Sequence, residues 1–383
     1  MCAVAQFYKS YANRIAQQKK VVYYFSQHKD ALFVRSDAED TMHIPDGYLS
    51  PQTFLPLYAV MVPIWTAAAR RVRRTLRTRH VPLLALGAAF SFVIMMFNIP
   101  APGGTSGHAV GAAIVAILLG PWAACVAVSL ALVIQALLFG DGGITTLAAN
   151  AFTMAVVMPF VGYYGYRLVA GNSPAGSPRR VVAGFVAGYL ALNAAALYTA
   201  VMFGIQPLIA SAPDGRPLYA PYPLSVTVPA MALQHLILFG VVEGVATALI
   251  IRYLQGTDPA LLSLNGGGGE ASAGTVQRLR FGLGVLALFS PLGVVLPWIF
   301  KAKTGWGEWG ADELARLAGF VPAGMKRLGE LWRAPLPDYA FAGQGDGVVM
   351  ASLAYLMSAA LGIALLLFCA RACGRLLTVR EEK

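Results

Sequence analysis

Residues Ala109–Phe139 form an apolar stretch with the sequence AVGAAIVAILLGPWAACVAVSLALVIQALLF. No Asp, Glu, Lys or Arg interrupts it, and Gly120-Pro121 divides it into two runs. A helix of about 20 apolar residues crosses the hydrocarbon core of a bilayer, so this stretch predicts membrane-spanning helices. The whole chain has the same character, since 57% of its 383 residues are hydrophobic and only 12% are charged. A soluble domain carries about 25% charged residues, so we predict an integral membrane protein and exclude a soluble enzyme or a disordered chain.

Nine apolar runs follow one another along the chain and predict an all-α fold. They cover residues 54–69, 82–97, 109–120, 122–139, 144–170, 181–203, 226–251, 281–300 and 348–370. A polar gap that contains Asn265 and four glycines separates the first seven runs from the last two, and such a composition is typical of a flexible tether. We therefore predict a seven-helix bundle over 42–254, a flexible cytoplasmic linker over 255–280 and a domain over 281–383. That last domain has two additional transmembrane helices and a long outer loop.

The basic residues predict how the chain lies in the membrane. The net charge is +11, and arginines follow the first, fifth, seventh and ninth runs. Alternating spans bring these loops to one side, and cytoplasmic loops carry an excess of Lys and Arg. The loop 301–347 holds six Lys and Arg on the other side, but long loops follow the rule weakly. We expect a multi-pass plasma-membrane protein with a cytoplasmic C-terminus, in contact with the lipid bilayer and with no nucleic-acid partner.

Two of the five histidines, His43 and His108, fall on the predicted outer face. His108 follows a loop rich in Gly and Pro, residues 98–107, and irregular backbone at the membrane edge is tolerated where it lines a cavity. Neutral imidazole is a good ligand for nickel, cobalt, copper and zinc. Most histidines bind no metal, however, and the alternative is that His108 begins its helix in contact with water.

The segment Met42–Ser50 reads MHIPDGYLS and could chelate a metal ion. If the mature chain begins at Met42, its free amine, the backbone nitrogen of His43 and the His43 imidazole can reach one ion through small chelate rings. One further imidazole would complete four nitrogens, and square-planar nitrogen coordination suits Ni(II) or Cu(II). The amine and amide lose protons when they bind, so the affinity is expected to rise with pH.

Two motifs, Met-His-Ile-Pro-Asp-Gly at 42–47 and Pro-Gly-Gly-Thr-Ser-Gly-His at 102–108, resemble the signatures of the CbiM/NikM family. These proteins are the substrate-binding S components of energy-coupling-factor transporters for cobalt and nickel. The resemblance covers residues 42–252 and implies that Met42, His43 and His108 bind Ni(II) or Co(II) as the transported substrate, with no organic cofactor. It also implies partners: a transmembrane T subunit (CbiQ/NikQ-like) and cytoplasmic ATPase subunits (CbiO/NikO-like). The chain is then not expected to be an enzyme, and it contains no Gly-x-x-x-x-Gly-Lys-Ser/Thr motif.

The C-terminal part resembles the small N component of the same transporters. Residues 304–310 read TGWGEWG and residues 336–339 read LPDY, in a loop between two apolar runs. This resemblance implies a fused M–N protein and leaves open whether a separate N component is also needed.

Residues 1–41 do not fit the family pattern. They contain six basic residues and no apolar core, so they do not form an ordinary signal peptide. While they remain attached, Met42 has no free amine. Three explanations are possible. An incorrectly assigned start codon is the favoured one, proteolytic cleavage of the extension ranks second, and a functional role for the extension ranks third.

Further polar residues are candidates for orienting the metal ligands, as second-sphere groups commonly do. They are Asp46, Asn98, Thr105, Ser106, His235 and Glu243. His235 and Glu243 lie eight residues apart and face roughly one side of a helix. Glu243 belongs either to the transport pathway and subunit contacts or, equally, to a hydrogen bond with a neighbouring helix. Three other residues are candidates for hydrogen bonds between helices: Gln135, Asp141 and Asn150.

Two other functions remain as alternatives. A stand-alone divalent-metal channel or facilitator would need a continuous polar path, and the apolar runs offer few charges for one. A membrane scaffold with an incidental pair of histidines would bind no metal at all.

Overall fold

The computed structural model describes residues 43–75, 80–101, 105–266, 272–302, 305–341 and 347–377. Met42 and the extension 1–41 lie outside the described residues. So do residues 102–104 of the second motif, Thr304, and residues 267–271 of the predicted linker.

All nine predicted apolar runs contain helix, which confirms the all-α membrane architecture. Seven helical segments are long and apolar enough to cross a membrane among the described residues. They are α2 (Pro51–Thr75), Pro121–Phe139, Leu147–Ala170, Pro178–Ile209, Leu224–Thr257, Ala273–Phe300 and Val348–Ala372 within α16 (Val348–Leu377). The shorter α3 (Val81–Met95) and α4 (Ala112–Leu119) account for the other two runs.

Several of these segments are composite. Pro121–Phe139 joins α5 (Pro121–Ile134) to a π-helical turn, η3 (Gln135–Phe139). Leu147–Ala170 consists of α6 (Leu147–Ala151), the π-helical η4 (Phe152–Val157) and α7 (Met158–Ala170). Pro178–Ile209 consists of α8 (Pro178–Gly204) and α9 (Gln206–Ile209). Leu224–Thr257 consists of α10 (Leu224–Gln234), the π-helical η5 (His235–Phe239) and α11 (Gly240–Thr257).

The third predicted span is only partly helical. Helix α4 has eight residues, so it is about 12 Å long and covers less than half of a hydrocarbon core of about 30 Å. A short antiparallel hairpin precedes it, formed by β1 (Ile99–Ala101) and β2 (Thr105–Gly107), with Pro100 opposite Ser106. The non-helical segment 108–111 connects this hairpin to α4. The hydropathy pattern recognised the apolar run but not this irregular first half.

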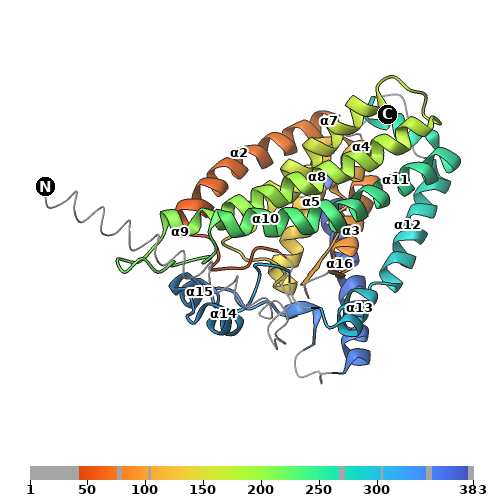
Figure 1. The fold of residues 1–383 in the computed structure, drawn as a ribbon. Coiled ribbons are helices and arrows are strands. Elements are labelled where there is room, and N and C mark those ends of the chain that lie inside the picture. The colour runs from red at the N-terminus through yellow and green to blue at the C-terminus, as the bar shows by residue number, and fades with distance from the viewer. Residues whose placement is uncertain are drawn as a thin grey trace, which may run out of the picture.

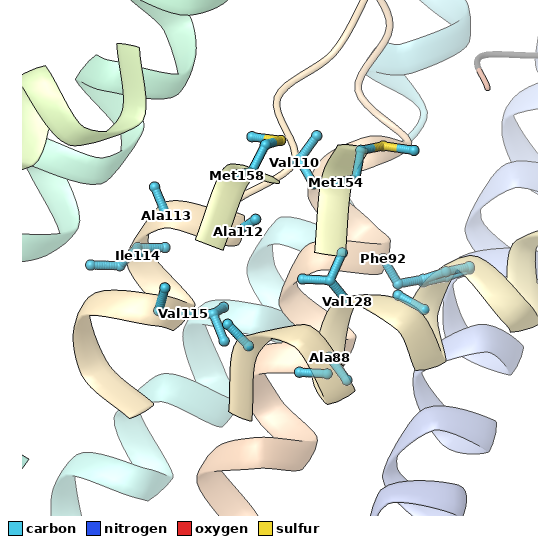
Figure 2. Close-up of a cluster of buried hydrophobic side chains, with 14 of the residues drawn as sticks. Ala88, Phe92, Val110, Ala112, Ala113, Ile114, Val115, Val128, Met154 and Met158 are labelled. Atoms are coloured by element: carbon cyan, nitrogen blue, oxygen red, sulfur yellow. The ribbon is translucent and has the colours of Figure 1, made fainter. Parts of the chain in front are cut away.

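Small side chains form the centre of the bundle around α4. Ala112, Ala113 and Ile114 are almost fully buried, and they belong to the same apolar cluster as Met154 and Met158 (Figure 2). Membrane helices associate through close packing, and small residues allow their backbones to approach. Packing on all sides explains how an eight-residue helix is held in place here.

The outward faces of the bundle are apolar. On α2, Leu55 and Val62 are more than half exposed, as are Phe281 and Leu288 on α12 (Ala273–Leu288). Long apolar side chains on the outside of helices of this length are typical of contact with lipid.

The C-terminal helices pack on the helices that precede them. Both α12 and α16 contact α3, and α13 (Leu292–Phe300) contacts α16. The loop 301–347 carries α14 (Ala311–Ala318) and α15 (Ala323–Leu328), which lie at the same end of the bundle as α9 (Figure 1). Helix α11 runs to Thr257, a 3-10 segment (η6, Pro259–Gly266) follows it, and α12 begins at Ala273. Regular structure therefore extends into the predicted linker from both sides, and the division into domains stays a prediction.

Candidate metal site

The segment that carries His43 is anchored to the loop between η3 and α6. The Asp46 carboxylate accepts hydrogen bonds from the backbone nitrogens of Ile144 (2.9 Å) and Thr145 (2.7 Å). The backbone nitrogen of Gly143 donates to the Ile44 carbonyl oxygen at 3.0 Å. A Cβ at Gly143 would lie 2.4 Å from the Asp46 nitrogen, so only glycine allows this approach. Asp46 thus fixes the position of the first motif.

The Asn150 amide holds the residue next to His43. Its Oδ1 accepts from the Ile44 nitrogen, and its Nδ2 donates to the Ile44 carbonyl oxygen, both at 3.1 Å. One side chain therefore satisfies both backbone groups of Ile44. The adjacent His43 is only 2% exposed, so its imidazole lies inside the protein.

The loop 301–347 packs directly over the first motif. The Tyr48 hydroxyl donates to the Trp309 carbonyl oxygen at 2.5 Å, and both residues share an apolar cluster with Ile44, Trp306 and Met325. The C-terminal region therefore covers the segment that carries His43.

Glu243 organises the start of α4, which follows His108. Its carboxylate accepts hydrogen bonds from the backbone nitrogens of Val110 (2.8 Å) and Gly111 (3.0 Å). Gly111 has φ +71°, a left-handed conformation that favours glycine. A buried donor left without an acceptor costs about 1–3 kcal/mol, and Glu243 prevents that cost twice. Two roles were considered for Glu243: a place in the transport pathway or subunit contacts, and a hydrogen bond to a neighbouring helix. The structure contains hydrogen bonds of the second kind, to the segment that precedes α4.

His43 and His108 lie together although 65 residues separate them in the sequence. Their ring centroids are 5.1 Å apart and the rings are inclined at 72°. The Nδ1 atom of His108 is 3.1 Å from the Ala109 carbonyl oxygen. Neither ring nitrogen of His43 has a well-aligned hydrogen bond to a residue within the described ranges. Its Nδ1 lies close to the Asp141 carboxylate, and Nε2 is a buried polar atom with no hydrogen-bond partner among the described residues.

Both imidazoles line a cavity of about 90 Å³. A cavity of about 10–15 Å³ already holds one water molecule, so this cavity has room for an ion together with several waters. Among the described residues, no three His, Cys, Asp or Glu side chains are arranged to bind one ion. The described histidines therefore need further donors, and the Met42 amine lies outside the described residues.

The structure separates the remaining candidates into two groups. Ser106 and His235 line the cavity, and His235 Nδ1 is 2.8 Å from the Met231 carbonyl oxygen. Asn98 and Thr105 do not line it. The Asn98 amide is instead directed to the hydroxyl of Tyr355 on α16, at 3.4 Å.

Asp141 was expected only to link helices, but it lies against the site. Its Oδ1 is 2.9 Å from Nδ1 of His43, and its Oδ2 accepts from the Tyr339 hydroxyl at 2.7 Å. Burial by itself would raise the pKa of Asp141, but the neighbouring imidazoles and Tyr339 lower that pKa to about 2. Asp141 is therefore ionised at neutral pH. Its place in the short loop 140–143, on the same predicted side as both histidines, was the available signal.

Two residues of the C-terminal region also reach the site and were not anticipated. Glu308, from the TGWGEWG motif, lines the cavity. Burial raises the pKa of Glu308 well above its ordinary value, and the Asp141 charge raises it further. Burial and the Asp141 charge likewise raise the pKa of Tyr339. Its hydroxyl is therefore protonated and donates a hydrogen bond to Asp141.

Of the three π-helical turns in the described residues, η4 and η5 line this cavity, whereas η3 lies next to the loop that carries Asp141. η3 ends just before Asp141, while η4 and η5 supply Met154 and Phe239 to the cavity wall. Such turns occur mostly inside α-helices and are frequent at functional sites.

Residues 43–261 match the family model described as CbiM, the cobalt uptake substrate-specific transmembrane region. The chain belongs to the CbiM family. With seven long apolar helical segments in the part of the chain that the structure describes, this CbiM protein is a multi-pass membrane protein. The resemblance seen in the two motifs is thereby confirmed.

Relatives of this CbiM protein extend over most of the chain. It is 49% identical over 342 residues to the fused nickel transport protein NikMN of Rhodobacter capsulatus, an alignment that covers 85% of this chain and 95% of that protein. It is 40% identical over 339 residues to the probable fused nickel transport protein LarMN of Lactiplantibacillus plantarum, which covers 86% and 97%. A crystal structure described as a transition metal transporter is 52% identical, with a TM-score of 0.53, and covers 57% of this chain and 94% of that one. The fused relatives agree with the N-like motifs of the C-terminal region.

Proposed function

We propose that this protein captures nickel or cobalt at the outer face of the membrane and is the substrate-binding subunit of an ATP-driven uptake transporter of the energy-coupling-factor type. One ion binds through the Met42 amine, the backbone nitrogen and imidazole of His43, and the imidazole of His108. The two imidazoles that line one cavity, with ring centroids 5.1 Å apart, carry this proposal. The names of the fused relatives, which are nickel transport proteins, support a metal ion as the substrate.

The chemistry of the donors favours a transition metal over magnesium or calcium. Those two ions prefer oxygen ligands, whereas imidazole and amine nitrogens suit nickel, cobalt and copper. Four planar nitrogens are a preferred geometry of Ni(II), and Co(II) can occupy the same set. Asp141 next to His43 adds a negative charge that balances the positive charge of the ion.

The direction of binding follows from the charges. Arg73 and Arg74 end α2, at the end that the positive-inside rule assigns to the cytoplasm. The first motif precedes α2 at its other end, where the loop 301–347 covers it. The cavity then opens to the outer side, and the end of α16 lies in the cytoplasm.

Energy must come from other subunits, because the sequence contains no P-loop motif. A transmembrane T subunit and cytoplasmic ATPases fill this role. A stand-alone channel would need a continuous polar path and is less well supported. The fully buried Glu243 carboxylate accepts hydrogen bonds from the backbone just before α4 and does not line the cavity, so it does not contribute to such a path.

Nickel accumulation in proteoliposomes without a membrane potential tests the ATP-driven mechanism. With the T subunit, the ATPases and ATP, the internal nickel concentration should rise above the external one. An ATPase variant that cannot hydrolyse ATP should remove this accumulation. If the chain alone equilibrates nickel as fast as the full complex does, and ATP adds no accumulation, the protein is a channel and the proposal is wrong.

A further inference from the structure

Tyr339 connects the C-terminal region to the first motif through the Asp141 carboxylate. It lies in a 3-10 turn, η7 (Pro337–Tyr339), is 3% exposed, and its hydroxyl donates to Oδ2 of Asp141 at 2.7 Å. Gln135 Nε2 donates to the same hydroxyl at 3.1 Å. The other carboxylate oxygen of Asp141 lies 2.9 Å from Nδ1 of His43. Tyr339, Asp141 and His43 thus form a continuous series of contacts between residues that are about 300 positions apart.

The protein holds Tyr339 in an unusual backbone conformation. Asp338 has φ 53° and Tyr339 has φ 61°, so two successive residues other than glycine are left-handed. Such conformations persist only where the surroundings impose them, and they occur preferentially at functional sites. Here the surroundings are specific: Ser358 Oγ donates to the Tyr339 carbonyl oxygen at 3.0 Å, and Phe139 stacks on the ring at 4.7 Å.

We propose that Tyr339 is a positioning residue for the metal ion and acts through Asp141. Its hydroxyl fixes the carboxylate close to the His43 imidazole, where it places a negative charge near the cation. Groups that orient a metal ligand in this way commonly contribute 10–100-fold to affinity. The inference rests on the proposed metal site and makes the C-terminal region a part of that site.

Tyr339→Phe is the direct test, because it removes the hydroxyl and keeps the ring that stacks on Phe139. Tyr355→Phe is the matched control: it removes the hydroxyl of the neighbouring buried tyrosine, which receives a hydrogen bond from Asn98 and not from Gln135. The full chain, beginning at Met42, is titrated with nickel against a competing chelator. We expect about tenfold weaker nickel binding for Tyr339→Phe and a shifted visible absorption band of the bound nickel. Tyr355→Phe should change the affinity by less than about twofold.

The same substitution in an Asp141→Asn background shows whether Tyr339 acts through Asp141. Residues that work through one contact have non-additive effects, so Tyr339→Phe should then change the affinity by less than about twofold. An equal loss in both backgrounds, or no loss in the wild-type background, would overturn the inference. If Tyr339→Phe does not fold, Gln135→Met removes the second donor to Asp141. Unchanged nickel affinity in that variant would overturn the inference as well.

The wild-type chain separates the two levels of the proposal. If it binds no nickel under these conditions, the proposed function and this inference both fail. If it binds one nickel ion and the affinity does not depend on Tyr339, only the inference fails.

Discussion

Alanine in place of either His43 or His108 is expected to abolish stoichiometric nickel binding. Each imidazole supplies one of the four proposed nitrogens, and both rings line the same cavity. Loss of an orienting group alone commonly costs 10–100-fold in affinity, so loss of a ligand should cost roughly 100-fold or more. Isothermal titration calorimetry on the purified protein measures both the stoichiometry and the affinity.

His80→Ala is the matched control for these variants. His80 precedes α3 and does not line the cavity, so its replacement should leave one nickel ion bound with unchanged affinity. The melting temperature of each variant without metal shows whether the fold is retained. Tight binding of one nickel ion by the folded double variant of His43 and His108 would mean that the site lies elsewhere.

Release of the first 41 residues is expected to create the metal site. With the extension attached, the Met42 nitrogen is an amide in the middle of the chain and the proposed terminal chelate cannot form. Two of the four nitrogens are then lost or weakened as ligands. A group that only orients a ligand contributes about 10–100-fold to metal affinity, so the loss of ligands should weaken nickel binding roughly 100-fold or more. The affinity of the released form should also rise with pH, because the amine and amide bind the metal without their protons.

One protein provides both states of this experiment. A protease site placed directly before Met42 allows nickel binding to be measured before and after cleavage, with N-terminal sequencing to verify the new end. Every other residue is the same in the two samples. Equal affinity before and after cleavage would exclude the Met42 amine from the site.

The apolar runs predicted the helices because burial in lipid demands long uncharged segments. They did not predict the shape of the third span, where 108–111 is irregular. Its backbone donors are satisfied by Glu243, which lies more than 130 residues further along the chain. Hydropathy is calculated for each segment separately, so it cannot predict a helix cap that a residue of another helix supplies.

Proximity in the sequence was an unreliable guide to the groups around the histidines. Asn98 lies near the second motif, yet the hairpin β1–β2 leaves its amide facing Tyr355. Asp141 and Tyr339 lie far from either motif and still meet beside His43. The motifs therefore indicated which histidines to consider, whereas the groups that orient them depend on tertiary contacts.

X-ray absorption at the nickel edge, on nickel-loaded protein that begins at Met42, reports the number, type and geometry of the atoms bound to the ion. The proposed site predicts a square-planar Ni(II) spectrum with four nitrogen neighbours, two of them showing the outer-shell scattering of imidazole rings. A spectrum of six oxygen neighbours in octahedral geometry, or one without imidazole scattering, would contradict a site built from Met42, His43 and His108.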